Sequence, residues 1–177
     1  MFTSKVHLKD KNLKKSDLEK TKDDWDYLYV ILNKYQELSQ ADSANFLDNL
    51  NDNQLALFGY RILDAQVTNG GFLQLIYNGY APYAFENTFI QTLRLWGAAS
   101  TADLLELVKP AGLQIAEKLQ NTGQFGEQRN MDAFSDLYKE YPEFDKYDDK
   151  YYEINKTELR IVKDYVAHNL SDFILVE

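Results

Sequence analysis

The stretch DAQVTNGGFLQLIYNGYAPYAF, residues 64–85, interrupts an apolar helical pattern with glycine. An Asn-Gly-Gly triplet occupies 69–71, and an Asn-Gly pair follows at 78–79. Asparagine and glycine adopt left-handed backbone angles most readily, and that conformation commonly ends a helix. We therefore expect one helix to stop before 69–71 and a second, short helix to stop at 78–79. Gly70 or Gly71, or both, should have a positive φ.

Two amide side chains in this stretch share one face of the short helix. Gln74 and Asn78 are four positions apart, which places them side by side on a helix. We expect Asn78 to be largely buried and to hydrogen-bond Gln74 or nearby backbone, so that the amides fix the bend. The alternative is a small polar pocket that also includes Tyr77 and binds or transforms a small molecule. The stretch is a poor match to a phosphate-binding loop, because the lysine and hydroxyl of that motif do not follow the glycines.

The composition around this stretch indicates one helical domain. The chain has 177 residues, of which 45% are hydrophobic and 14% aromatic, with only 8 Gly and 3 Pro. Apolar residues recur at helical spacing, and no segment shows sustained period-two alternation, so the expected fold class is all-α. We expect a basic, flexible leader at 1–15 and a single globular multi-helix domain at 16–177.

Capping and breaking residues predict where several helices begin and end. Asn51 should cap a helix that starts just after it, and Ser100 should cap another. Pro110 should kink or divide the helix that Ser100 begins. Near the end of the chain, Asn155 with Glu158 three positions later is typical of the start of a final, separate helix.

Few residues in the chain are suited to catalysis or metal binding. There is no cysteine and there are only two histidines, far apart, so we expect no metal site and no cofactor. The hydrolase, metalloprotease and nucleotide-binding motifs are absent, and we predict a protein without enzymatic activity. No signal peptide or apolar span is evident, which favours a cytoplasmic protein without a membrane partner.

The charge is distributed unevenly along the chain. The formal net charge is −9, yet residues 1–22 alone carry +4, so the remaining 155 residues carry −13. An acidic body disfavours direct nucleic-acid binding and favours a basic protein partner. The alternative is an ordinary solvated acidic surface that has no partner.

A helical wheel over 142–154 gathers these charges on one side of a helix. It places aromatic residues on one face and a stripe of acidic side chains opposite, with Tyr152 inside the stripe. The stripe consists of Asp145, Asp148, Asp149 and Glu153. We expect all four carboxylates to be exposed and to bind a basic partner. Their spacing, one charge per roughly 3–4 Å of axis, is about half the charge density of duplex DNA. A second acidic element should therefore lie alongside, for which 23–26 and 42–52 are candidates.

The same stretch that bends the chain also resembles a known family. The pattern V-x-N-G-G-F-x-Q-x-x-x-N is followed by a helix that closes in Trp-Gly-Ala, and a segment at 144–173 is similar to the acidic-aromatic end of that family. The matching residues, whose role we expect to be structural, are Val67, Asn69, Gly70, Gly71, Phe72, Gln74, Asn78 and Gly97. The family is a bacterial one named for a DNA-mimic protein, and the similar region covers about 50–173. Gln66 stands where the resemblance implies a glutamate.

The resemblance implies an all-α domain of roughly eight to ten helices and no cofactor. It also implies a DNA mimic, whose carboxylates replace phosphates and so occupy a basic nucleic-acid-binding protein, such as a DNA-binding regulator. The runner-up is an immunity or antitoxin-like protein that neutralises a basic toxin. A third hypothesis is an enzyme or binder that uses the corner formed by Gln74 and Asn78. A homodimer is compatible with each of these.

Overall fold

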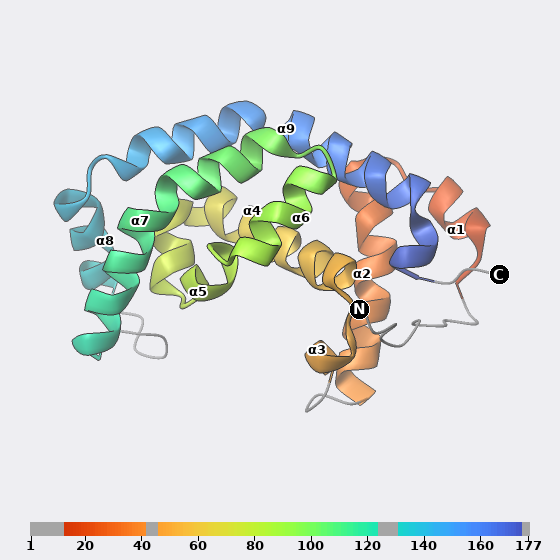
Figure 1. The fold of residues 1–177 in the computed structure, drawn as a ribbon, viewed down its shortest axis with the longest axis horizontal. Coiled ribbons are helices and arrows are strands. Elements are labelled where there is room, and N and C mark those ends of the chain that lie inside the picture. Colours follow the sequence, from red (N-terminus) through yellow and green to blue (C-terminus); the bar gives the residue numbers. More distant parts are fainter. Residues whose placement is uncertain (1–12, 42–45, 124–130, 175–177) are drawn as a thin grey trace.

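The computed structural model describes residues 13–41, 46–123 and 131–174, and these parts form an all-α domain (Figure 1). The predicted fold class is confirmed, with nine α-helices and a short 3-10 helix in the described ranges. In chain order they are α1 (Lys15–Glu19), α2 (Asp24–Ala41), α3 (Phe46–Asn49), α4 (Asp52–Tyr77), α5 (Ala81–Ala84), α6 (Asn87–Leu95), α7 (Ala99–Asn121), α8 (Met131–Glu140), α9 (Phe144–His168) and η1 (Leu170–Asp172). Residues 1–12 of the predicted leader lie outside the described residues, whereas Leu13 is buried.

The core forms where α4, α7 and α9 pack together. α4 runs through the middle of the molecule and contacts α6, α7 and α9, while α9 lies along one edge (Figure 1). The α8 end of the molecule is opposite the end formed by α1 and α2. Leu57 and Phe72 of α4, Leu105 of α7 and Val162 of α9 belong to one cluster of buried apolar side chains. Their burial is the main source of stability, since each large side chain contributes about 1.5–3 kcal/mol.

The glycine pair breaks α4 as the sequence predicts. Gly71 has φ 72° and ψ −177°, and Gly70 has φ −163° and ψ 29°, so neither is helical. Two helical halves, 52–69 and 72–77, are thus joined at an angle within α4. Gly79 has φ 84° and follows the end of the second half. The predicted double helix stop is therefore confirmed.

Asn51 caps α4 as predicted: its side chain accepts a hydrogen bond from the backbone N–H of Gln54, 2.8 Å away. The other boundary predictions were less accurate. α7 begins after Ala98 rather than at Ser100, and Pro110 lies inside α7 without dividing it. Asn155 does not start a helix, because α9 continues unbroken from Phe144 to His168.

Candidate functional site

Side chains of α8 and α9 bind the backbone groups that the break in α4 exposes. The backbone N–H of Phe72, the first residue of the second half, donates to Asp148 Oδ1 at 2.7 Å. The Tyr152 hydroxyl donates to the Val67 carbonyl at 3.0 Å. The Tyr138 hydroxyl lies 2.8 Å from the Gly70 carbonyl oxygen and 3.0 Å from Asp148 Oδ2. Helix ends leave such groups without partners, and here the partners come from tertiary neighbours.

Gly71 allows this close approach. A Cβ at this position would overlap Asp148 Oδ2 and the Tyr138 hydroxyl, and its φ of +72° also disfavours side chains. Glycine is therefore required here for two independent reasons, one conformational and one steric.

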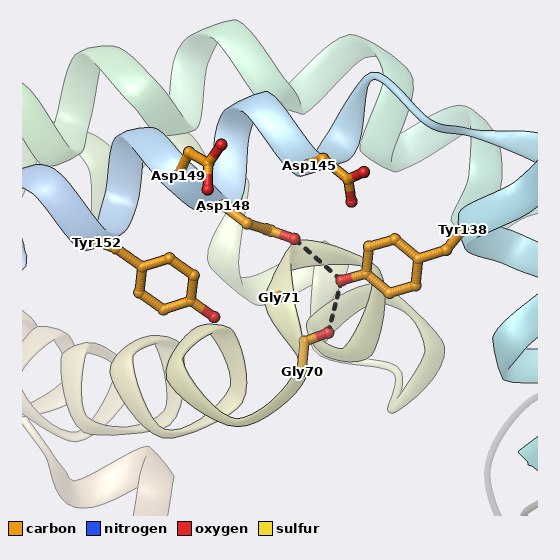
Figure 2. A pocket seen from close by; sticks show the side chains of 7 residues that line it. All are labelled: Gly70, Gly71, Tyr138, Asp145, Asp148, Asp149 and Tyr152. Atoms are coloured by element: carbon orange, nitrogen blue, oxygen red, sulfur yellow. Dashed lines mark hydrogen bonds between the residues drawn. The ribbon is translucent and has the colours of Figure 1, made fainter.

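A pocket of about 490 Å³ lies where the break, α8 and α9 meet (Figure 2). Its lining combines two glycines of the break, two tyrosine side chains and three carboxylates, and none of these seven residues is cationic. They are Gly70, Gly71, Tyr138, Asp145, Asp148, Asp149 and Tyr152. We call it the break pocket. In Figure 2, Tyr138 and Tyr152 approach it from opposite sides, and the three carboxylates lie along α9 between them.

The prediction that Asp148 is solvent-exposed is wrong. Only 7% of the residue is exposed, because its carboxylate is directed at the break and accepts hydrogen bonds from Phe72 and Tyr138. A helical wheel describes one helix by itself, so it cannot show that a backbone N–H of α4 needs the Asp148 carboxylate as its acceptor. Asp148 is therefore a structural residue that also lines the break pocket.

The remaining side chains of the predicted stripe are exposed. We call Asp145, Asp149, Tyr152 and Glu153 the acidic face. Tyr152 is 47% exposed, although its hydroxyl is bound to the backbone of α4. Glu153 lies 3.2 Å from Lys150, but both side chains are exposed, and such pairs contribute little to stability. The predicted role of the acidic face in partner binding stays a prediction.

The negative charge of the pocket affects the ionisation of its own members. Burial raises the pKa of Asp148, and the nearby charges of Asp145 and Asp149 raise it further. The hydrogen bonds from Phe72 and Tyr138 oppose this shift by stabilising the carboxylate. Burial also raises the pKa of Tyr138, with the charge of Asp148 as the next cause. The carboxylates of the pocket therefore interact with one another and with the Tyr138 hydroxyl.

Three candidates for the second acidic element that the structure describes, Asp24, Asp48 and Asp52, lie away from the acidic face. Asp24 of α2 is 3.3 Å from Arg160, which lies about 10 Å of helix axis beyond Glu153. Asp48 and Asp52 are exposed, but they are close to the start of α4, whereas the break is near its far end. Asp42 lies outside the described residues.

A second carboxylate of α9, that of Glu158, is also buried and has a structural role that we did not predict from the sequence. Glu158 is only 3% exposed and accepts a hydrogen bond from the backbone N–H of Thr101, 2.9 Å away, in the first turn of α7. The spacing of Asn155 and Glu158 is thus not a capping box for a final helix. Glu158 instead caps α7, a helix distant in sequence, which accounts for the wrong boundary prediction.

The amide side chains of the corner are linked to one another in a chain of hydrogen bonds. Gln66 Oε1 accepts from Asn78 Nδ2 at 2.6 Å and from Gln74 Nε2 at 3.1 Å. Asn69 Nδ2 donates to Gln74 Oε1 at 2.9 Å. The side chain of Asn78 is hydrogen-bonded within the corner, but the prediction is wrong in its details: the partner is Gln66 rather than Gln74 or backbone, and the residue is half-buried rather than largely buried. None of these four amide residues lines the break pocket.

Among the residues that the structure describes, no three His, Asp or Glu side chains are grouped in a way that could hold a metal ion. None of their helices combines the length and apolar character needed to span a membrane.

Sequence reasoning missed Tyr138, which contacts both the break and Asp148. The chain contains 13 tyrosines, and nothing in the local sequence of Tyr138 distinguishes it from the others. Only the packing of α8 against α4 reveals its role.

Comparison with known proteins relates the same region to one family. The model of a family described as DMP19-like protein matches residues 48–169, which include the break, α8 and all of α9. The chain is also similar to a protein of Neisseria meningitidis serogroup B named DNA mimic protein DMP19. The two sequences are 30% identical over 146 residues, which is 82% of this chain and 86% of that protein.

Proposed function

This chain belongs to the DMP19-like protein family, and on that premise we propose that it is a non-enzymatic DNA mimic. It would bind a basic, DNA-binding protein through the acidic face and thereby compete with nucleic acid for that protein. The acidic face would occupy the positions that phosphates take in DNA. Direct binding of this chain to nucleic acid is disfavoured by its net charge of −9.

The observation that carries the proposal is the cluster of carboxylates at the break pocket. Asp145 and Asp149 are exposed at the pocket, beside the buried Asp148, and none of the described residues that line it is cationic. A protein surface normally intersperses charges of both signs, so a concave site with one sign favours a cationic ligand group. The similarity to DNA mimic protein DMP19 of Neisseria meningitidis is consistent with such a ligand being part of a DNA-binding protein.

The pocket suits one arginine or lysine side chain of the partner. Its carboxylates would accept hydrogen bonds from a guanidinium or ammonium group, and a guanidinium can bind a carboxylate with two parallel bonds. The rings of Tyr138 and Tyr152 border the same space and would contact the cation or its aliphatic stem. These basic side chains are also the ones that bind DNA phosphates.

The test is affinity capture from a native lysate at low and high salt, followed by mass spectrometry of the eluted proteins. A variant with Asp145→Asn, Asp149→Asn and Glu153→Gln should lose a basic protein that the wild type retains at low salt. Its thermal stability should change little, since all three residues are exposed. The captured protein should also be released from the wild type by duplex DNA.

A matched control removes the same charge elsewhere. Glu19→Gln, Glu37→Gln and Asp48→Asn neutralise exposed carboxylates on α1, α2 and α3, at the end of the molecule away from α8 (Figure 1). This variant should retain the partner. Equal loss in both variants would indicate non-specific attraction and contradict the proposal. A captured toxin instead of a DNA-binding protein would favour the immunity hypothesis.

A further inference from the structure

The Gly70–Gly71 break in α4 shapes the fold and also contacts the helix that carries the acidic face. The break lies directly beneath the acidic face, and three of its backbone groups bind side chains of α8 and α9. We propose that the Gly70–Gly71 break is a positioning site, which holds the first half of α9 so that the acidic face is presented in a fixed geometry. This inference rests on the proposed function, because it explains how that face is kept ready for a cationic partner.

A face of like charges needs an attachment that does not cancel its charge. Asp145, Asp148 and Asp149 carry like charges on one stretch of α9 and so repel one another; after burial, the charges of Asp145 and Asp149 also raise the pKa of Asp148. A salt bridge to lysine or arginine would relieve the repulsion but would also neutralise the field that attracts a partner. The break offers neutral groups instead: the Phe72 N–H and the Val67 carbonyl bind α9 directly. The attachment therefore leaves the formal charge of the face intact.

Tyr138 links three elements and gives a test without a charge change. Its hydroxyl lies within hydrogen-bonding distance of the Gly70 carbonyl and of Asp148, while its ring packs against Phe134 of the same helix. Tyr138→Phe removes only the hydroxyl, so the net charge and the ring contacts are preserved. A loss of cation binding that is accompanied by faster hydrogen exchange in 144–153 would then be assigned to the position or mobility of α9, since the ring of residue 138 still borders the pocket.

The matched control is Tyr35→Phe. The Tyr35 hydroxyl also donates to a backbone carbonyl, that of Phe173, at 2.8 Å, and the residue is fully buried. Tyr35 belongs to α2, at the opposite end of the molecule from α8 (Figure 1). Both variants therefore lose one tyrosine–carbonyl hydrogen bond, but only one of them loses it at the break.

The experiment measures two quantities on wild type and both variants. Hydrogen exchange with mass spectrometry reports the mobility of residues 144–153, and isothermal titration with a synthetic oligo-arginine peptide reports cation binding at low and high salt. Tyr138→Phe should speed exchange in 144–153 and weaken peptide binding about threefold or more. Tyr35→Phe should change neither the exchange in 144–153 nor the peptide affinity, even if it lowers thermal stability as much as Tyr138→Phe does.

Each contrary result has a distinct meaning. Unchanged exchange in 144–153 and unchanged peptide affinity in Tyr138→Phe would overturn the positioning role. Equal weakening of peptide binding by Tyr35→Phe would also overturn it, because the effect would then be general destabilisation. If the wild type binds the peptide no better than the variant with the neutralised acidic face, the proposed function fails. The exchange comparison would still decide whether the break orders α9.

Discussion

Asp148 Oδ1 accepts a hydrogen bond from the backbone N–H of Phe72 at 2.7 Å and so joins α9 to the break in α4 across 76 positions of sequence. Glu158 makes the equivalent bond to the N–H of Thr101 at the start of α7. Two carboxylates of one helix thus serve as caps for two other helices. The acidic residues of α9 therefore include buried ones that hold the fold, Asp148 and Glu158, and exposed ones that make no such cap.

The first prediction concerns Gly71. Gly71→Ala should lower the free energy of unfolding by about 2 kcal/mol or more, because the positive φ and the overlap with Asp148 and Tyr138 add. Gly123→Ala is the control: that glycine has φ +66° but no atom within 4 Å of an added Cβ. Gly123→Ala should lower the free energy of unfolding by about 1 kcal/mol, because only the conformational effect of the positive φ is present there. Urea unfolding measures both, and equal costs would show that the close approach at Gly71 contributes nothing.

The second prediction is a pH dependence caused by Asp148. Its pKa in the folded protein is raised above the ordinary value of 3.8, so the folded state binds this proton more tightly than the unfolded chain does. The resulting stabilisation is complete below the unfolded pKa and is lost as pH rises through the folded pKa. The neutral carboxyl could also donate to the Tyr138 hydroxyl, which would leave that hydroxyl free to bind Gly70.

Urea unfolding of the wild type and Asp148→Asn at a series of pH values tests this sign. The wild type should be most stable relative to the variant in acid, and its advantage should shrink as the pH rises towards neutrality. Asp149→Asn removes one of the charges that raise the pKa of Asp148, so it should shift the transition to lower pH. A wild-type advantage that grows with pH would contradict the direction of the shift.

The local signals for helix ends were readable from sequence. Asn51 and Gly79 act through their own backbone and their nearest neighbours, and both ended or began helices where expected. The burial of Asp148 could not be predicted from the sequence, because it depends on a backbone group of another helix. The same limit explains Glu158, whose partner belongs to α7. Periodicity describes one helix, whereas a tertiary cap requires knowledge of two.

The third prediction concerns Glu158. Glu158→Ala should lower the free energy of unfolding by about 2 kcal/mol, because the N–H of Thr101 would be left buried without an acceptor. Glu158→Gln keeps an amide oxygen that can accept this bond but loses the charge near the start of α7, so about 1 kcal/mol is expected. Glu153→Gln, an exposed change on the same helix, should stay within about 0.5 kcal/mol. Equal stability of the three variants would show that the cap contributes nothing.

The fourth prediction concerns Gln66, whose Oε1 accepts hydrogen bonds from both Gln74 and Asn78. Because the amide network uses Gln66 as an acceptor, a carboxylate should replace it well, and Gln66→Glu should change the free energy of unfolding by less than about 0.5 kcal/mol. Gln66→Leu has a similar size but no acceptor, and it should cost about 1–2 kcal/mol, since two half-buried amide groups would lose their partner. Gln91→Leu, at an exposed position of α6, controls for the change to an apolar residue and should have little effect. Thermal and urea unfolding of the three variants decide the outcome. If Gln66→Glu is as destabilising as Gln66→Leu, the side-chain NH₂ group of Gln66 matters as well, and its role is not that of an acceptor alone.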